Sequence, residues 1–422
     1  MTHPFENFWP RCQRLFRNAT LRQRQIAGLI GVYLAGYMLI DADAVKHSYL
    51  LIPLNNLNVA EAQAWLSGRL DLDVGPLRGE RPWDSALFQG RIYNVFPPMF
   101  TLVSAAVMTI VPDGVPNSVL IVLLLLPMPG LAYALFLRRT DRVWLAGLLA
   151  CGYLLGTSLL PLMNLGLRNG QVWHVNHLLS QIGLLIFLLD YFGRRRIWLG
   201  GAGLIVAAWS RQLAVLYWIP LAYLALSRKE PSWRRFGLLS LGVVTVVLVA
   251  LPATLNALKF GNPLDCGYRY VYEGRWDDAD DLPAQDARKG LFSPVFIPRN
   301  LYYMNLGLPL LDSPWWLVRF LPNPHGTGIW WTTPVLLFVL SDWRRLWRRR
   351  DVFYPLIAAV LVFAVLMLFH TTGRAQLGYN RFSMDFVIVL LAAIGPVCGG
   401  PRRKWITFGF VLWSIWYFRW AI

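Results

Sequence analysis

The stretch that decides the fold is VFYPLIAAVLVFAVLMLF, which runs from Val352 to Phe369 without a charged residue. A helix needs about 20 such residues to cross the hydrocarbon core of a bilayer. LLSLGVVTVVLVALPA, from Leu238 to Ala253, has the same character. Only 15% of the residues are charged, whereas a soluble domain carries about 25%. We therefore predict an all-α, polytopic transmembrane helical bundle.

Most basic residues lie in short clusters between the apolar runs, and the net charge is +17. Because Lys and Arg favour the cytoplasmic side of a membrane, these clusters indicate topology rather than a nucleic-acid surface, and we expect no nucleic-acid partner. The clusters begin at Arg11, Arg138, Gly193, Ser227, Asp342 and Pro401. Residues 1–25 are then a cytoplasmic basic segment, and residues 26–422 form one transmembrane domain in a bacterial inner (cytoplasmic) membrane.

Placing every basic cluster in the cytoplasm predicts about 11 or 12 helices. The expected external loops carry short interfacial helices and lie near 41–94, 164–174, 254–326 and 370–382. The expected helices include 26–40, 143–163, 175–191, 236–253, 327–341, 352–369, 383–399 and 405–421. The stretch 198–226 is predicted as two short helices with Ser210 and Arg211 in an external turn between them, because a lone charge in a span is costly.

Two details of this topology concern the external loops. Two apolar runs lie between Asn94 and Arg138, and two full crossings would put Arg138 and Arg139 outside. Either one run is re-entrant or this cluster departs from the positive-inside rule. In NVAEAQAWLSGRLDL the apolar residues have helical spacing, with Glu61 and Gln63 opposite, which predicts an amphipathic helix lying on the membrane.

Acidic residues in the first external loop are candidate catalytic bases. Asp41 and Asp43 follow the first helix, close in sequence to Lys46 and His47. A carboxylate can act as a general base when a neighbouring cation keeps it ionised. Asp84 precedes a predicted turn and is a third candidate. The alternatives are that these residues mark a helix end or form a turn.

Three external arginines are candidates for binding a donor phosphate. Arginine binds phosphate in a bidentate manner through its planar guanidinium. Arg211 lies between two apolar halves, and the loop HTTGRAQLGYNRFSMDF carries Arg374 and Arg381. The alternatives are a structural carboxylate partner for Arg211, and pairing of the loop arginines with an acidic loop.

Further residues are candidates for binding a sugar or acceptor, because aromatic rings stack on pyranoses while polar groups bind hydroxyls. His174 and His177 lie three residues apart and share a helix face. They could equally be interfacial. The other candidates are His47, Asp265, Tyr268 and Tyr379.

The sequence predicts no cofactor and no metal site. The four cysteines are far apart, without metal-ligand spacing. The acidic run DDADD from Asp277 to Asp281 could attract a divalent cation, but a solvated acidic loop is the simpler interpretation.

The order of several motifs resembles the bacterial GT-C superfamily, polytopic glycosyltransferases that include protein O-mannosyltransferases and the aminoarabinose transferase of lipid A. The motifs are AEAQAWLSGRLDL, WDSALFQGRIYNVFPPMF, QVWHVNH, AAWSRQ, KFGNPLDCGYRY, FIPRNLYY, GTGIWWTTP and RAQLGYNRFSMDF, and the resemblance runs from about Asp41 to about Leu391. The resemblance implies an inverting glycosyltransferase that moves a sugar from a polyprenyl-phosphate donor to a glycan, lipid or protein acceptor at the external face, among membrane lipids.

In that family a carboxylate shortly after the first helix deprotonates the acceptor, which would be Asp41 or Asp43 here. Arginines near the membrane hold the leaving phosphate, a role that would fall to Arg211 and Arg381. Asp84, His174 and Tyr268 would then orient the sugar or acceptor. The sequence has D-x-D rather than the usual paired Asp-Glu at the first position, and we expect no soluble C-terminal domain like that of the oligosaccharyltransferases.

The alternative function is a transporter or flippase for a lipid-linked glycan. A transporter is expected to carry ionisable groups near the membrane midplane and often an internal repeat. The sequence has few such charges and no evident repeat, which favours chemistry at one face.

Overall fold

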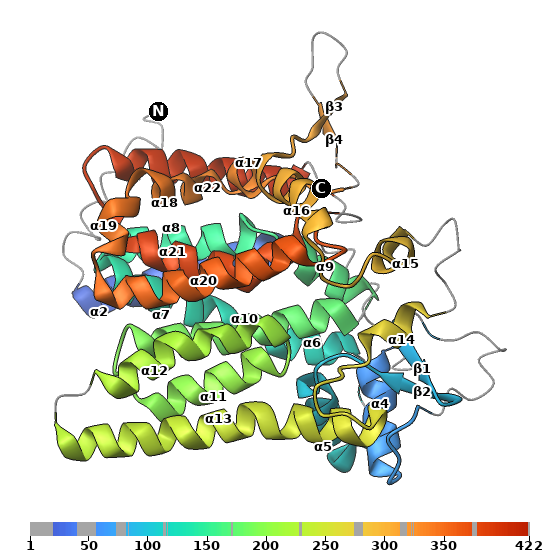
Figure 1. The fold of residues 1–422 in the computed structure, drawn as a ribbon. Coiled ribbons are helices and arrows are strands. Elements are labelled where there is room, and N and C mark those ends of the chain that lie inside the picture. The colour runs from blue at the N-terminus through green and yellow to red at the C-terminus, as the bar shows by residue number, and fades with distance from the viewer. Residues whose placement is uncertain are drawn as a thin grey trace.

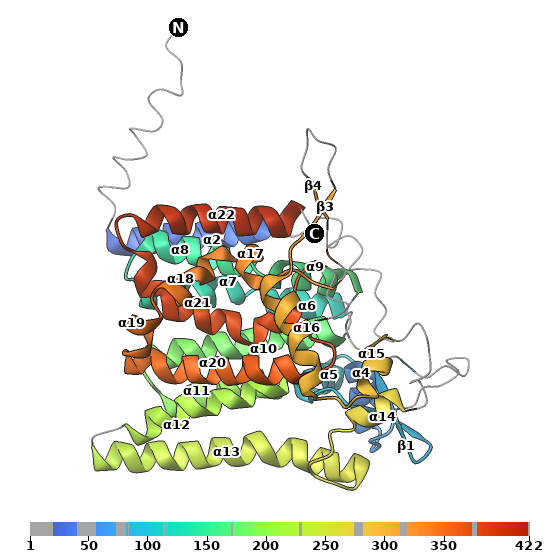
Figure 2. The same ribbon diagram turned by 45° about the horizontal axis from the view of Figure 1, so that its top comes forward.

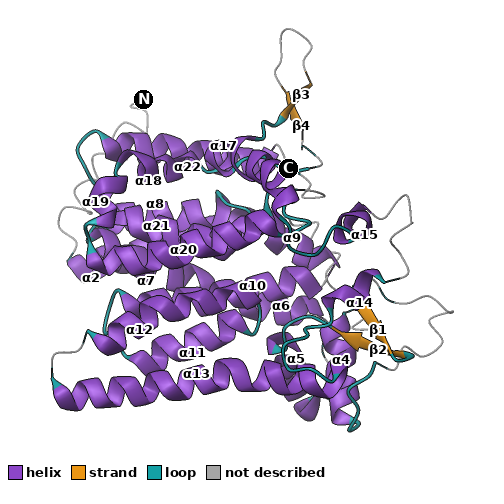
Figure 3. Cartoon of the chain, in the orientation of Figure 1, coloured by secondary structure: helices purple, strands orange, loops and turns teal. Residues whose placement is uncertain are grey.

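The computed structural model describes residues 20–39, 56–72, 82, 84–112, 115, 117–169, 172–227, 230–273, 282–312, 319–321, 323, 325–373 and 378–420. Long helices lie side by side as a bundle (Figure 1). Within the described residues, the strands form two small hairpins at one end of that bundle (Figure 3). The predicted all-α class is therefore confirmed for this part of the chain.

The elements fall into three groups. The helices of 12 or more residues are α2 (Leu21–Leu39), α5 (Met99–Ile110), α7 (Met128–Thr140), α8 (Val143–Leu155), α10 (Val172–Tyr191), α11 (Ile197–Ala208), α13 (Pro231–Phe260), α20 (Arg350–Leu368), α21 (Met384–Cys398) and α22 (Arg403–Trp420). The shorter helices are α4 (Leu57–Leu66), α6 (Asn117–Leu125), α9 (Leu159–Asn169), α12 (Trp218–Leu226), α14 (Tyr268–Tyr272), α15 (Leu282–Ala287), α16 (Ile297–Leu301), α17 (Ile329–Thr332), α18 (Leu337–Ser341) and α19 (Trp343–Trp347). The strands are β1 (Ser85–Phe88), β2 (Arg91–Asn94), β3 (Leu310–Asp312) and β4 (Arg319–Leu321).

Five helical segments in the described residues are long and apolar enough to cross a membrane. They are Val119–Thr140, Val172–Tyr191, Pro231–Phe260, Arg350–Leu368 and Arg381–Cys398. A sixth is possible if Val143–Leu155 and Leu159–Arg168, bent by 49°, form one broken span. The predicted total of about 11 or 12 crossings stays a prediction.

Helix α13 exposes apolar side chains of the kind that contact lipid. Its side chains Leu239, Val246 and Val249 are 68%, 65% and 56% exposed, along a helix of 30 residues. A contiguous apolar surface of this kind is unusual on a soluble monomer. It is favourable against hydrocarbon, where the helix also satisfies its own backbone hydrogen bonds.

Among the described residues between Asn94 and Arg138, one helical segment is long enough to cross a membrane. Helix α5 has 12 residues and is about 18 Å long at 1.5 Å per residue, well short of the hydrocarbon thickness of about 30 Å. Helices α6 and α7 together give the 22-residue segment Val119–Thr140. This arrangement favours the first of the two alternatives, in which one apolar run does not cross.

The basic turns gather at the end of the bundle opposite the hairpins, on the left in Figure 1, and Figure 2 keeps the two ends apart. Arg139 forms an ion pair of 3.4 Å with Asp351. Arg142 donates a hydrogen bond to the Gly399 carbonyl, and Arg403 pairs with Asp342. Segments that are far apart in sequence thus meet at one basic end.

Two local expectations need correction, and a third is confirmed. The predicted helix at 327–341 is broken into α17, a 3₁₀ turn (Pro334–Leu336) and α18, because Pro334 has no N–H to continue the helix. The loop predicted at 164–174 is shorter, since α9 extends to Asn169 and α10 begins at Val172. By contrast, α11 and α12 are two short helices with Ser210 and Arg211 in the turn that precedes the second, as predicted.

Glu61 does not lie on a solvated polar face of α4; it is fully buried. Lys259, near the end of α13, pairs with its carboxylate. Asn94 and Thr101 donate hydrogen bonds of 2.7 and 2.6 Å to the other carboxylate oxygen. Buried charges need such partners. The prediction for Glu61 is wrong because its partner lies 198 residues away in the chain, where the local pattern does not reveal it. Gln63, in contrast, is exposed as expected.

Helices α10 and α11 cross with their backbones close together. A side chain added to Gly183 would stand 2.5 Å from the Ala207 nitrogen and from the Gly203 oxygen. Small residues allow two helix backbones to approach closely in membranes. This crossing brings the start of α10 and the end of α11 to the polar cluster described next.

Candidate functional site

Polar side chains from five segments meet at the end of the bundle that carries the hairpins. We call them the polar cluster: Asp84, Trp173, His174, His177, Arg211, Tyr268, Arg381 and Asp385. They come from the residue before β1, the start of α10, the turn after α11, the start of α14 and the beginning of α21. Each of these residues is held in position by a helix or strand, or by a turn next to one, whose other residues pack elsewhere in the fold.

Arg211 and Asp385 form the strongest contact of the polar cluster. The Arg211 guanidinium donates hydrogen bonds of 3.1 and 2.8 Å to the two carboxylate oxygens. Burial alone lowers the pKa of Arg211, but the Asp385 carboxylate outweighs burial, so the pKa lies above its ordinary value. The structure therefore gives Arg211 a carboxylate partner, one of the two alternatives that the sequence left open.

Arg381 has a different environment, made of aromatic rings. Its guanidinium carbon lies 5.2 Å from the ring centre of Trp173 and 5.3 Å from that of Phe382. Its side chain makes no hydrogen bond or ion pair with any residue that the structure describes. A guanidinium held by rings keeps its hydrogen-bond donors available for an anion.

Asp84 is fixed at the entrance to the β1–β2 hairpin. Its carboxylate accepts a hydrogen bond of 2.7 Å from the Trp173 indole. Its backbone has φ of 60°, in the left-handed region, which is uncommon for a residue other than glycine. Trp173 thus links Asp84 to Arg381, because one indole contacts both.

Tyr268 lies within electrostatic range of both arginines and of Asp84. Burial raises the pKa of Tyr268 well above its ordinary value, while Arg211 and Arg381 oppose this and Asp84 adds to it. Tyr379 is also buried beside Arg381. Burial raises the pKa of Tyr379 to about 12, and Arg381 again opposes the shift. Both phenols therefore remain protonated at neutral pH and can donate hydrogen bonds.

His174 and His177 carry buried ring nitrogens that have no hydrogen-bond partner among the described residues. These are Nδ1 of His174 and both nitrogens of His177. His177 Nδ1 lies 3.9 Å from Asp385 Oδ1, too far for a hydrogen bond. An unpaired buried polar atom costs about 1–3 kcal/mol and calls for an explanation such as a bound ligand or water.

Among the described candidates, Asp265 does not join this group. Asp265 pairs with Arg269 at 2.8 Å and accepts hydrogen bonds from Gly267 and Tyr270. In the described residues, no three His, Cys, Asp or Glu side chains are close enough together to hold a metal ion. Asp41, Asp43, His47 and Arg374 lie outside the described residues.

Sequence reasoning missed three residues of this site. Trp173 contacts both Asp84 and Arg381, Phe382 lies under both arginines, and Asp385 holds Arg211. Asp385 lies four residues after Arg381, a spacing at which helical neighbours share a face, but its partner Arg211 comes from the turn after α11. No known family, curated protein or solved structure matched this chain in our comparisons.

Proposed function

We propose that this protein is a membrane glycosyltransferase that uses a polyprenyl-phosphate sugar and acts at the membrane face where the polar cluster lies. The segregation of basic turns to the opposite end supports this orientation, because Lys and Arg favour the cytoplasm. The proposal places the N-terminus in the cytoplasm and the polar cluster on the external side of a bacterial inner membrane. It adopts the GT-C resemblance of the sequence motifs.

The observation that carries the proposal is the environment of Arg381. Its guanidinium is partly buried among aromatic rings, and no described residue neutralises it with an ion pair. A phosphate at this point would satisfy that charge in a bidentate manner. Arg211 is 23% exposed and its charge is neutralised by Asp385, so Arg381 is the arginine of the polar cluster that remains available to a phosphate.

The reaction assigns a role to each group. A carboxylate takes the proton of the acceptor hydroxyl or amine, and the acceptor atom forms a bond to the anomeric carbon. The bond from that carbon to the phosphate oxygen breaks, and the lipid phosphate leaves with the electron pair. Arg381 stabilises the charge that develops on the phosphate. The candidates for the base are Asp41, Asp43 and Asp84, of which the structure describes Asp84.

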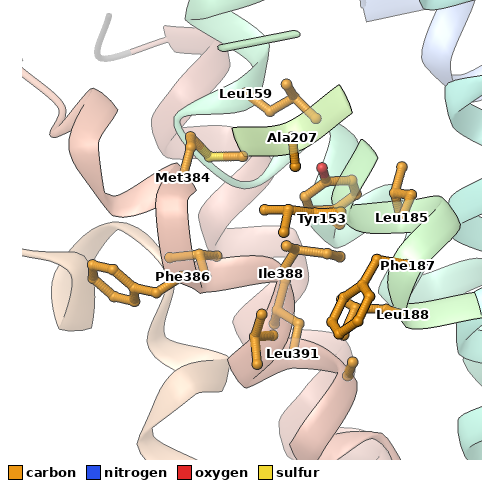
Figure 4. Packing of buried hydrophobic residues seen from close by; sticks show 14 of the residues in the cluster. Tyr153, Leu159, Leu185, Phe187, Leu188, Ala207, Met384, Phe386, Ile388 and Leu391 are labelled. Carbon is orange, nitrogen blue, oxygen red and sulfur yellow. The ribbon is translucent and has the colours of Figure 1, made fainter. Parts of the chain in front are cut away.

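The middle of the bundle favours an enzyme over a transporter or flippase. Between Gln181 and Asp190, α10 has only the apolar residues IGLLIFLL. Leu185, Phe187 and Leu188 from this stretch pack with Ile388 and Leu391 of α21 (Figure 4). A transport path is expected to bring polar groups to the midplane. In α10 and α21, apolar side chains occupy this position instead.

The test measures sugar transfer by purified protein from radiolabelled polyprenyl-phosphate sugars to cell-envelope extract. We expect wild type to transfer label and Arg381→Gln to lose about 100- to 1,000-fold in rate, the usual effect of removing one donor to a developing charge. Donor binding should weaken less, because the developing charge is larger than that of the ground state.

The matched control is Arg91→Gln at the same end of the bundle. Arg91 forms only an exposed surface pair of 3.8 Å with Asp71, so transfer should stay within twofold of wild type. Absence of transfer from every lipid-phosphate sugar, together with transport of a lipid-linked glycan by reconstituted vesicles, would overturn the proposal in favour of the flippase.

A further inference from the structure

A hollow of about 380 Å³ opens at the basic end of the bundle, far from the polar cluster. Its walls come from Arg142 after α7, Arg345 on α19, Arg403 at the start of α22 and the segment 395–401. Three parts of the chain that are distant in sequence, near residues 140–142, 345 and 395–403, therefore enclose one space. We call it the basic hollow.

The glycines of segment 395–401 shape the basic hollow. A side chain on Gly395 would stand 2.8 Å from Cβ of Arg139, so only glycine lets α7 approach this closely. Arg142 donates a hydrogen bond to the Gly399 carbonyl, which holds its guanidinium against the wall. Arg139 itself is occupied, because it pairs with Asp351 and donates to the Ala392 carbonyl at 2.8 Å.

The basic hollow keeps an excess of positive charge. Arg403 is the one lining arginine with a carboxylate partner, Asp342, among the described residues. The hydrogen bond of Arg142 goes to a neutral carbonyl. The Arg345 side chain is exposed and makes no ion pair or hydrogen bond with the described residues. Two guanidiniums thus remain without a counter-charge at one small concavity.

The position of the basic hollow along the helices matches the headgroup layer of a membrane. The apolar segments Val119–Thr140 and Arg381–Cys398 both end at its wall. Trp343 and Trp405, 52% and 68% exposed, lie two residues from Arg345 and Arg403. Exposed indoles favour the interface between hydrocarbon and water. A ligand at this depth is presented by the bilayer rather than by the aqueous phase.

We propose that the basic hollow binds the phosphate group of an anionic phospholipid. A phosphodiester carries one negative charge and accepts the paired hydrogen bonds that guanidiniums offer. The acyl chains of the lipid would lie along the exposed apolar surface of the neighbouring helices. This site does not depend on the proposed glycosyltransferase activity, since it lies at the other end of the bundle.

The test is native mass spectrometry of the whole purified protein titrated with phosphatidylglycerol, with phosphatidylcholine and with inorganic phosphate. We expect preferential binding of phosphatidylglycerol. Arg345→Gln should weaken that binding about fivefold, and the double variant Arg142→Gln with Arg345→Gln about 30-fold, because each basic residue near an anionic surface contributes about a factor of five. Arg345 has no structural contact to lose, so its single variant should fold normally.

The matched control is Arg348→Gln with Arg402→Gln, which removes two charges from the same end without touching the hollow. It should leave binding within twofold of wild type. Equal losses in both double variants would mean a diffuse basic surface and would overturn the proposal. Binding of inorganic phosphate as tight as that of phosphatidylglycerol would assign the hollow to a soluble phosphate instead.

Discussion

Arg211 meets Asp385 edge to edge, through two hydrogen bonds of 3.1 and 2.8 Å between residues 174 positions apart in the chain. The pair joins the turn after α11 to the first turn of α21, and the Tyr217 hydroxyl donates to the Asp385 backbone carbonyl at 2.7 Å. The segment from Arg211 to Tyr217 and the start of α21 are therefore fixed to each other at the polar cluster by one carboxylate and its backbone.

Replacing Asp385 should destabilise the protein strongly. Asp385→Asn leaves the Arg211 guanidinium largely buried without its counter-charge, which costs about 3–5 kcal/mol. Thermal unfolding in detergent measures this. The matched control is Asp265→Asn, whose partner Arg269 is 67% exposed, so its cost should stay below about 1 kcal/mol. Equal stability of both variants would show that the Arg211–Asp385 contact has no structural weight.

The buried pair of Glu61 and Lys259 makes a second prediction. Glu61→Gln keeps an acceptor for Asn94 and Thr101 but leaves the buried Lys259 charge without a counter-charge. The free energy of unfolding should fall by about 3 kcal/mol. Adding Lys259→Met removes that charge and should recover most of the lost stability. Thermal unfolding of the single and double variants forms a complete cycle. A double variant no more stable than Glu61→Gln would contradict this interpretation.

The crossing of α10 and α11 should not tolerate a side chain. Gly183→Val places atoms within 2.5 Å of the α11 backbone, and overpacking of this kind costs about 1–3 kcal/mol or more. We expect a lower yield of folded protein in detergent, measured by size-exclusion chromatography. Gly242→Val is the control, since nothing lies within 4 Å of a side chain at Gly242. It should elute as wild type does.

Protonation of His370 should make the free energy of unfolding depend on pH. Burial lowers its pKa to about 4, and Nε2 lies 3.1 Å from the Tyr272 hydroxyl. Because the folded state resists protonation, the unfolded state takes up the proton first as pH falls below about 6.5. Stability should fall by about 3 kcal/mol between pH 6.5 and 4 through this group, and level off below pH 4.

The measurement is thermal unfolding of wild type and His370→Gln across that pH range. The glutamine can still hydrogen-bond to Tyr272 but cannot titrate, so its curve should lack this component of the decline. Identical pH profiles for the two proteins would show that His370 does not titrate as expected.

Several features of the fold could be predicted from local sequence. The turn at Ser210 and Arg211 followed from a charge between two apolar halves, and the structure has two short helices there. The grouping of basic turns also followed from their spacing between apolar runs. The failure at Glu61 has an equally clear cause, since the pattern of α4 suggested a solvated carboxylate and only α13 supplies its partner.

The sequence by itself determined that long apolar helices form and that basic turns separate from the polar loops. Both properties depend on each segment alone, through the transfer of its side chains out of water and the charge at its ends. The tertiary structure decided which charges are neutralised: Arg211 by Asp385 and Glu61 by Lys259, while Arg381 rests on aromatic rings. Those outcomes depend on helices that meet only after folding, and a short-range pattern does not encode such meetings.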